Sequence, residues 1–459
     1  MRPACLLLTV LALALAAPDA APAAEDDDDP YRWLEKVEGE KALNWVKERS
    51  AEDTAEIEAV PEFAPIHEDL LEIYNSRDRI PGIRLRGPWV YNFWRDAEHV
   101  RGVWRRTFLA SYLDDEPVWE TVIDVDALAE AEGENWVWKG AQGLAPDYRR
   151  FLVSLSRGGG DATVVREFDA VQKDWVEGGF QLPEAKSSMS WKDIDHVWVG
   201  TDFGEGSLTE SGYPRIVKLW TRGTPLADAE TIFAGEPTDV SAGAYTSRTP
   251  EGIYHLVYRT PEFFRGEYFM ILDERIVKLE MPEDASPNGL FKDQLLISLR
   301  SDWNTGEGVY LQGSLLAMDV DRFLAGDRAF QVLFEPSERV SLGGVRTTRD
   351  LLLLTTLDNV RSRLYEYRYT GEAWTKQEVE LPGLGAAGVG ATSDEHDTYF
   401  VSYTDFLTPS SLFIKRPGEE LAQVKSTPEF FDSTGMQVEQ YEARSADGTM
   451  IPYFAVMPA

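Results

Sequence analysis

The residue types that perform covalent catalysis do not occur in this 459-residue chain in the settings that such chemistry requires. A hydrolase serine sits in a G-x-S-x-G turn, which presents its hydroxyl beside backbone N–H groups. No G-x-S-x-G occurs in the sequence, and the single cysteine, Cys5, lies in the apolar N-terminal stretch. We therefore expect no catalytic nucleophile among these residues, and no disulfide in the mature chain.

The sequence pattern also predicts no metal and no cofactor. Asp124 and Asp126 start like a calcium-binding loop, but the glycine required at the sixth position and the glutamate at the twelfth are missing. We interpret this stretch as the end of a strand that passes into a short solvated turn. The histidines stand singly, with no second His or Cys at metal-ligand spacing: His67, His99, His196, His255 and His396.

A run of glycines from Gly158 to Gly160 invites comparison with a phosphate-binding loop. Such loops follow a strand, open a helix and carry Gly-Lys-Ser/Thr. Here a strand-like stretch, ATVVREFD, comes after the glycines, and no Lys-Ser/Thr is present. We therefore predict a hairpin turn at this position.

The chain is strongly acidic, with 79 Asp and Glu against 45 Lys and Arg and a formal net charge of −34. A charge of this sign repels nucleic acids and anionic membrane surfaces, so we predict neither as a partner. Solubility is the simplest interpretation of the acidity. Attraction of cationic peptides is the sharper interpretation.

Residues 1–24 have the features of a cleavable signal peptide. Arg2 supplies a positive charge, an apolar run extends from Leu6 to Ala16, and small residues in APAA precede Glu25. The apolar run is too short to span a membrane. We expect the mature protein to be periplasmic or secreted.

Residues 25–82 are predicted to form a helical segment. A second short helix is expected around residues 66–74. The pattern is amphipathic, so its apolar face must lie against another surface. In the first part of the segment, apolar residues recur at spacings of three and four: Trp33, Leu34, Val37, Leu43, Trp45 and Val46.

From about residue 85 the periodicity of apolar residues changes to two, which is typical of strands. Seven units of three or four short strands succeed one another at intervals of roughly 50 residues, a spacing that is typical of β-propeller blades. The fold class expected for residues 83–432 is mainly β, a seven-bladed β-propeller, with a pair of β-sandwiches as the structural alternative. The units begin near residues 88, 149, 196, 254, 294, 350 and 398.

The last stretch, residues 433–459, is predicted to contain a β-hairpin. Strand-like residues 440–444 and 452–457 flank Ala446, Asp447 and Gly448, and a glycine at this place can adopt positive φ. A hairpin of two strands is marginal alone and needs a larger sheet to join.

Several stretches resemble sequences of the prolyl oligopeptidase family of serine peptidases, and of its bacterial branch in particular. They run in one order from residue 29 to the end, which makes the resemblance far more specific than a lone glycine pattern. The stretches are DPYRWLE (29–35), LSRGGGDATVVREFD (155–169), GGFQLPEAKSSMSW (178–191), TDFGEGSLTESGYPRIVKLWTRG (201–223) and RSADGTMIPYF (444–454).

The resemblance implies an enzyme in which a seven-bladed propeller caps an α/β-hydrolase domain. In this family the Ser-Asp-His triad comes after the propeller in the chain, so no catalytic residue can be assigned here. The helical segment before the propeller would pack on the hydrolase domain. Residues 433–459 would be the first hairpin of that domain, truncated before the triad, and the chain alone is expected to be inactive.

The resemblance also implies one substrate-binding residue. In prolyl-specific members an aromatic side chain just before an S-x-M-x-W-like stretch reaches the proline pocket. The matching stretch here is SSMSW (187–191), and the residue before it is Lys186. Proline stacking from this position is therefore not expected, which puts strict specificity for cleavage after proline in doubt.

The function predicted from these observations is the substrate-gating propeller portion of a prolyl oligopeptidase-like serine peptidase. Its partners would be short peptide substrates and its own C-terminal hydrolase domain. One alternative is a secreted, non-enzymatic β-propeller that binds peptides or proteins. Another is a propeller enzyme of the glycosidase or lactonase kind, which would work through carboxylates in the channel or through a bound metal.

Overall fold

The computed structural model describes residues 29–36, 39–273, 275–429 and 431–458. These described residues form two compact units, divided between Tyr74 and Asn75, which we describe separately. The predicted signal peptide lies outside the described residues, as does Val37.

The N-terminal unit is helical, as its periodicity predicts. It contains η1 (Arg32–Glu35), α1 (Glu40–Glu58) and α2 (Phe63–Asn75). The rings of Trp33 and Trp45 pack edge to face with centroids 6.0 Å apart, and so join η1 to α1. Among the described helices, none is long and apolar enough to cross a membrane. Within this unit several large apolar side chains stay exposed, namely Leu43, Val46, Ile57, Val60, Ile66, Leu70, Leu71 and Ile73.

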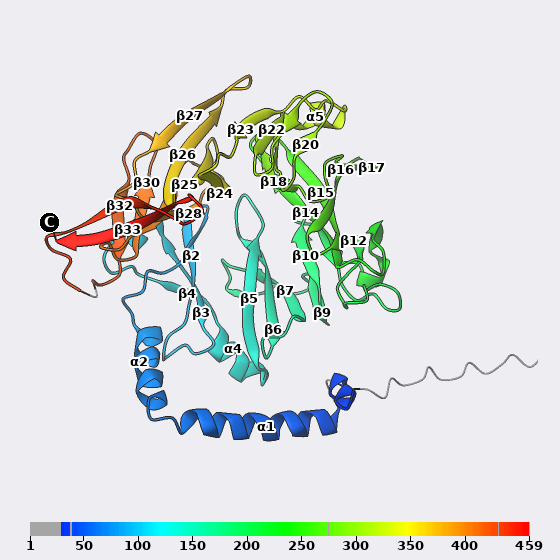
Figure 1. Cartoon of the computed structure of the whole chain (residues 1–459). Coiled ribbons are helices and arrows are strands. Elements are labelled where there is room, and N and C mark those ends of the chain that lie inside the picture. Colours follow the sequence, from blue (N-terminus) through cyan, green and yellow to red (C-terminus); the bar gives the residue numbers. More distant parts are fainter. Residues whose placement is uncertain (1–28, 37–38, 274, 430, 459) are drawn as a thin grey trace, which may run out of the picture. The chain divides into compact units, whose positions relative to one another are not determined.

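The second unit contains seven antiparallel sheets that succeed one another along the chain and form a seven-bladed β-propeller (Figure 1). This arrangement confirms the predicted fold class and excludes the pair of sandwiches. Blades 1 to 3 are β1 (Arg84–Arg86), β2 (Trp89–Trp94), β3 (Val103–Phe108) and β4 (Glu120–Asp124); β5 (Trp136–Gly143), β6 (Arg150–Arg157), β7 (Thr163–Asp169), β8 (Asp174–Trp175) and β9 (Gln181–Ala185); and β10 (Ser188–Trp191), β11 (His196–Gly200), β12 (Ile216–Thr221) and β13 (Glu230–Ala234).

The remaining blades repeat the same plan. They are β14 (Ser241–Arg248), β15 (Ile253–Glu262), β16 (Arg265–Leu272) and β17 (Arg275–Lys278); β18 (Ser286–Phe291), β19 (Gln294–Ser298), β22 (Leu315–Asp319) and β23 (Gln331–Phe334); β24 (Val340–Thr347), β25 (Leu352–Asp358), β26 (Arg361–Tyr369) and β27 (Trp374–Val379); and β28 (Ala386–Thr392), β29 (Tyr399–Thr404), β30 (Ser411–Lys415) and β31 (Ala422–Ser426). Short elements in the connections are α3 (Leu109–Tyr112), α4 (Val125–Glu132), η2 (Leu226–Asp228), β20 (Trp303–Asn304), β21 (Val309–Tyr310) and α5 (Val320–Leu324).

The first strand of each blade is the innermost one. Four of these first strands, β1, β5, β24 and β28, line one common cavity although they come from opposite ends of the chain. The seven unit starts expected from the sequence coincide with the second strands, which are more apolar than the first. Small residues dominate the first strands, so their alternation is weak in the sequence.

Each blade buries both faces against its neighbours, which explains the continuous apolar runs in its central strands. In β25 the side chains of Leu352 and Leu354 enter the core between blades 5 and 6, whereas Leu353 enters the core between blades 6 and 7. Seven such apolar clusters occupy the seven interfaces between blades. The alternation of side chains along a strand therefore holds the ring together.

The ring closes by packing between blade 7 and blade 1. In the described chain the two blades share no strand. Their interface contains Val90 and Tyr112 from blade 1 and Phe400 and Ile414 from blade 7, all buried. The amine of Lys425 adds a hydrogen bond of 3.0 Å to the carbonyl oxygen of Asp114.

The structure corrects the interpretation of the stretch that begins at Asp124. This stretch is the helix α4 rather than a solvated turn. The Asp124 carboxylate accepts a hydrogen bond from the backbone N–H of Ala127, and Gly133 ends the helix in the left-handed conformation at φ 66°. An N-cap aspartate and a C-terminal glycine are the usual signals of helix ends. The glycines near residue 158 do form a hairpin turn, between β6 and β7.

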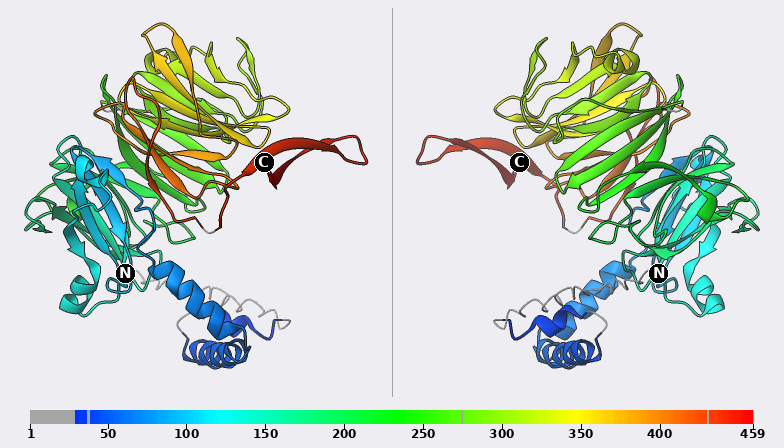
Figure 2. Two further views of the ribbon diagram at one scale, coloured as in Figure 1. Left: turned by 90° about the vertical axis from the view of Figure 1, so that its left-hand side faces the viewer. Right: turned by 90° about the vertical axis from the view of Figure 1, so that its right-hand side faces the viewer.

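The unit ends in a two-stranded hairpin of β32 (Met436–Arg444) and β33 (Met450–Pro458) (Figure 2). Gly448 occupies its turn with φ 92°, as the sequence predicts. The hairpin contacts blade 6 through Gln440, whose amide donates to the Asn359 carbonyl oxygen at 2.6 Å. It also contacts blade 7, where the rings of Phe454 and Phe406 have centroids 5.3 Å apart. In Figure 2 the hairpin, in red, projects away from the blades toward its turn.

Candidate functional site

Strand direction assigns each loop to one of two faces of the propeller. Because successive strands are antiparallel, the connections between blades all lie on one face, which we call the connection face. The turns between the first and second strands lie on the other, which we call the opposite face. The chain enters the ring at the start of β1 and leaves it at the end of β31, and both points lie on the connection face.

Lys186 lies on the connection face, between β9 and β10. Its amine donates to the carbonyl oxygen of Ser211 at 3.1 Å and lies 4.2 Å from the centre of the Tyr213 ring. The Tyr213 hydroxyl in turn donates to Asp161 at 2.9 Å, and this contact raises the pKa of Tyr213. The lysine is therefore held against its neighbours, and its predicted role in substrate binding stays a prediction.

A cavity of about 1300 Å³ lies along the inner strands of blades 1, 2, 6 and 7. Its wall combines small residues of β28, such as Gly388 and Gly390, with aromatic rings of the first two blades. The rings of Phe93 and Trp138 stack almost in parallel, with centroids 5.2 Å apart and an interplanar angle of 8°. A pocket of this size and mixed character suits a peptide better than a single small metabolite.

A second cavity, of about 450 Å³, lies among the turns of the opposite face. The hydroxyl of Tyr148 donates to the Asp394 carboxylate there, at 3.3 Å. Burial, together with the negative charge of Asp394, raises the pKa of Tyr148 to about 12. Tyr148 is therefore a hydrogen-bond donor at neutral pH and cannot serve as a base.

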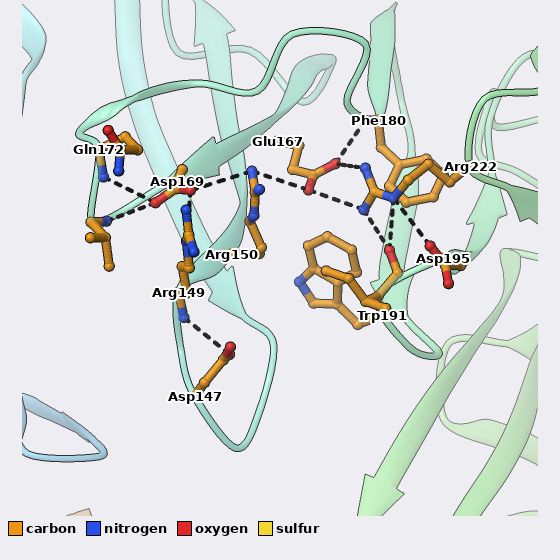
Figure 3. A network of polar contacts seen from close by, with 12 residues as sticks. Asp147, Arg149, Arg150, Glu167, Asp169, Gln172, Phe180, Trp191, Asp195 and Arg222 are labelled. Carbon is orange, nitrogen blue, oxygen red and sulfur yellow. Dashed lines mark hydrogen bonds and ion pairs between the residues drawn. The ribbon is translucent and has the colours of Figure 1, made fainter.

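A buried polar network joins blades 2 and 3 near the opposite face (Figure 3). The fully buried carboxylate of Glu167 accepts two hydrogen bonds from Arg222, at 2.8 and 3.1 Å, and one from the Phe180 N–H. Arg150 lies between Glu167 and Asp169, at 4.0 and 3.6 Å from their oxygens. Glu167 and Asp169 are both paired with arginines, so the network stabilises the interface between blades 2 and 3.

The histidines do not gather into a site, and several of them contact a neighbouring side chain. His99 lies 3.1 Å from Asp96 and His196 lies 2.8 Å from Asp193. Burial, with the nearby charge of Lys192, lowers the pKa of His255. Within the described ranges no three or more His, Cys, Asp or Glu side chains are grouped as metal ligands would be.

The sequence pattern does not indicate the cavity, because much of its lining comes from the first strands, in which apolar and polar residues alternate only weakly. Arg84 and Arg86 of β1, Lys139 of β5 and Arg346 of β24 all contribute to the wall. One feature of the sequence could have indicated these cavity-lining cations. Each of them comes shortly before the apolar second strand of its repeat.

Comparison with known proteins supplies the class. The chain matches the family described as "Prolyl oligopeptidase, N-terminal beta-propeller domain" over residues 20–259 and 310–426. The fold and this match thus define the propeller domain of a peptidase family. The chain belongs to the prolyl oligopeptidase family, as the sequence motifs predicted.

Individual relatives agree with this assignment. An uncharacterized peptidase of Sinorhizobium fredii is 36% identical over 95% of this chain and 61% of its own length. A prolyl endopeptidase of Elizabethkingia miricola is 25% identical over 92% of this chain and 58% of its own length. The solved structure of a post-proline cleaving enzyme from Rickettsia typhi, 28% identical, superposes with a TM-score of 0.84 over 93% of this chain and 64% of that one.

This chain aligns with only part of each of these relatives. The chain spans about three fifths of the length of the curated relatives that it matches. The activity, substrates and partners of a complete enzyme are therefore matters of proposal.

Proposed function

We propose that this chain is the N-terminal propeller portion of a prolyl oligopeptidase-like serine peptidase that hydrolyses short peptides. The observation that carries the proposal is the family match, which extends through all seven blades except for a gap at residues 260–309. The Ser-Asp-His triad would belong to the part of the relatives that this chain does not cover, and an acyl-enzyme would form on that serine. The hairpin β32–β33 would be the first hairpin of the α/β-hydrolase domain.

In this proposal the propeller selects substrates by size. A folded domain of 100 residues, with a radius of gyration of about 13 Å, occupies several times the volume of the inner cavity. A short unfolded peptide fits within its 1300 Å³. Only such peptides would reach a catalytic centre covered by the propeller.

Cleavage after proline is the finer part of the proposal. The Rickettsia typhi relative is described as a post-proline cleaving enzyme. In the present chain Lys186 occupies the position where the resemblance places an aromatic side chain, and its amine is held by Ser211 and Tyr213. We infer a preference for proline that is weaker than strict.

Export is proposed from the signal-peptide pattern at residues 1–24. The mature protein isolated from the periplasm or the medium would begin at Glu25, and N-terminal sequencing would show it. An N-terminus at Met1 in the mature protein would remove this part of the proposal.

Labelling with a fluorophosphonate probe tests the peptidase function. The product of the whole gene should be labelled at a serine outside residues 29–458 and should cleave short peptides faster than the same sequence within a folded protein. The present chain alone should stay unlabelled. A whole gene product that binds peptides without labelling would instead be the non-enzymatic binding propeller.

A further inference from the structure

The inner strands of the propeller have a charge opposite to that of the protein as a whole. The chain contains 79 acidic residues against 45 basic ones. Yet the seven first strands, β1, β5, β10, β14, β18, β24 and β28, contain no Asp or Glu at all. Their charged residues are all basic: Arg84, Arg86, Lys139, Arg248 and Arg346.

Four of these cations line the 1300 Å³ cavity, and only one acidic residue, Asp394, joins them in its wall. The carboxylate of Asp394 is engaged by the Tyr148 hydroxyl at 3.3 Å, toward the opposite face. The cavity wall therefore carries a net positive charge inside a protein of net charge −34.

The inner cations lack the carboxylate partners that several other cations of the propeller have. Arg259 on β15 is held between Asp239 at 2.7 Å and Glu267 at 2.9 Å. Among the described residues, by contrast, no carboxylate lies within 4.0 Å of any of the five inner-strand cations. The Arg84 side chain forms no hydrogen bond there, and that of Arg346 contacts only the Val345 carbonyl oxygen, at 3.1 Å.

The same is true across the cavity. Arg86 donates to the carbonyl oxygen of Leu85 at 2.8 Å, and Lys139 donates to that of Gly159 at 2.9 Å. Each of these cations therefore keeps donors available for a ligand. Cations that face a cavity without carboxylate partners suit an anion that binds between them.

The wall between the cations is apolar and aromatic, which decides the kind of anion. The stacked rings of Phe93 and Trp138 lie in the same wall as Arg84 and Lys139. Inorganic phosphate would use the charges alone. A peptide that carries carboxylates together with apolar side chains would use both surfaces.

We propose that the inner cavity is a cationic site for acidic peptides, which bind through their Asp and Glu carboxylates to Arg84, Arg86, Lys139 and Arg346. This inference rests on the proposed function, because only a peptidase would treat the bound peptides as substrates. It adds to that function the kind of peptide that the propeller favours. The total charge of the protein suggests that it attracts cationic peptides, whereas the charge of the cavity favours acidic ones. Acidic surface groups are screened beyond about 8 Å at physiological ionic strength, so the cations within the cavity dominate once a peptide has entered.

The test measures binding and needs no hydrolysis. A fluorescein-labelled, glutamate-rich peptide is titrated with the full chain, beside matched peptides in which every Glu is Gln or Lys, and fluorescence anisotropy is recorded. The Glu peptide should bind at least about tenfold more tightly than either counterpart. Raising the ionic strength from about 0.1 M to about 1 M should remove this advantage.

Two double variants locate the site. Arg84→Gln with Arg346→Gln should weaken binding of the Glu peptide at least about tenfold and leave the Gln peptide unchanged. Lys376→Gln with Arg444→Gln removes the same charge from exposed positions on β27 and β32, without touching the cavity, and should change neither. Circular dichroism and thermal melting of both variants would establish that they are folded.

Several results would overturn the proposal. They are equal binding of the Glu and Gln peptides, tighter binding of the Lys peptide, no binding of any peptide, and an equal loss in the control variant. Binding of a DNA oligonucleotide without binding of the Glu peptide would make the site one for nucleic acid and would equally refute it. Loss of the proposed function is separate, because that shows as an absent fluorophosphonate label on the whole gene product while peptide binding persists.

Discussion

The carboxylate of Glu167 and the guanidinium of Arg222 form a bidentate ion pair between blades 2 and 3, with both oxygens engaged at 2.8 and 3.1 Å. The Glu167 side chain is completely buried, whereas that of Arg222 is 25% exposed. The cost of removing this carboxylate from water is therefore offset mainly by its pairing with Arg222.

Replacing Arg222 by methionine should destabilise the propeller by about 3 kcal/mol, because a buried carboxylate then lacks its main partner. The value lies at the lower end of the usual range since Arg150 stays 4.0 Å from Glu167. Urea unfolding of the two proteins would measure it. The matched control is Arg416→Met, which breaks the exposed pair with Glu419 and should cost less than about 1 kcal/mol. Equal losses in the two variants would contradict the assigned role.

Asp96 should make the stability of blade 1 depend on pH. Burial alone would raise the pKa of its carboxylate, but hydrogen bonds from the His99 N–H, the His99 ring, Trp94 and the Glu98 N–H lower it to about 2. A folded-state pKa below the unfolded value of 3.8 means that the stabilisation is present above pH 4 and is lost as the pH falls toward 2.

The variant Asp96→Asn should therefore be less stable than the wild type by about 2 kcal/mol at pH 6, and by roughly half of that at pH 3. Denaturant titrations at the two pH values would give both differences. Asp115→Asn serves as the control, because its side chain is exposed and has no hydrogen-bond partner in the described part of the chain. A difference that stays constant between pH 6 and pH 3 would refute the assignment.

The hairpin β32–β33 should promote self-association of this chain. It is a separate two-stranded sheet, so the outer edges of both strands are unpaired, and Ile451, Tyr453 and Val456 are exposed. Light scattering on residues 25–459 should show oligomers, and the double variant Ile451→Ser with Tyr453→Ser should reduce them. Val118→Ser removes a single exposed side chain from the propeller and should not. A clean monomer of the unmodified chain would count against this prediction.

Lys186 should influence the preference for proline in the product of the whole gene. Replacing it by phenylalanine restores the aromatic residue that the family resemblance places there, and should raise kcat/KM for peptides cleaved after proline relative to peptides cleaved after alanine. Lys192→Phe provides the control, because it introduces the same ring directly after the other end of β10. An unchanged ratio for both variants would show that residue 186 does not contact the substrate.

The sequence by itself determined the repeat and the number of blades. Apolar runs such as those of β25 and β29 recur at a regular spacing because each central strand is buried on both faces between two neighbouring blades. The terminal turn was equally predictable, since Gly448 at φ 92° satisfies a local requirement. The α4 helix also had a local signal in Asp124 and Gly133, and the prediction of a turn overlooked it.

The tertiary structure alone decided the partners across the ring. Arg84 and Arg346 lie far apart in the sequence and face one cavity only because the seven blades close a circle. Glu167 and Arg222 are 55 positions apart and meet at an interface between blades. Local patterns specify a strand and its turns, because their physics acts over a few residues. The charge of a cavity depends on which strand edges meet at the axis, and packing between blades determines that.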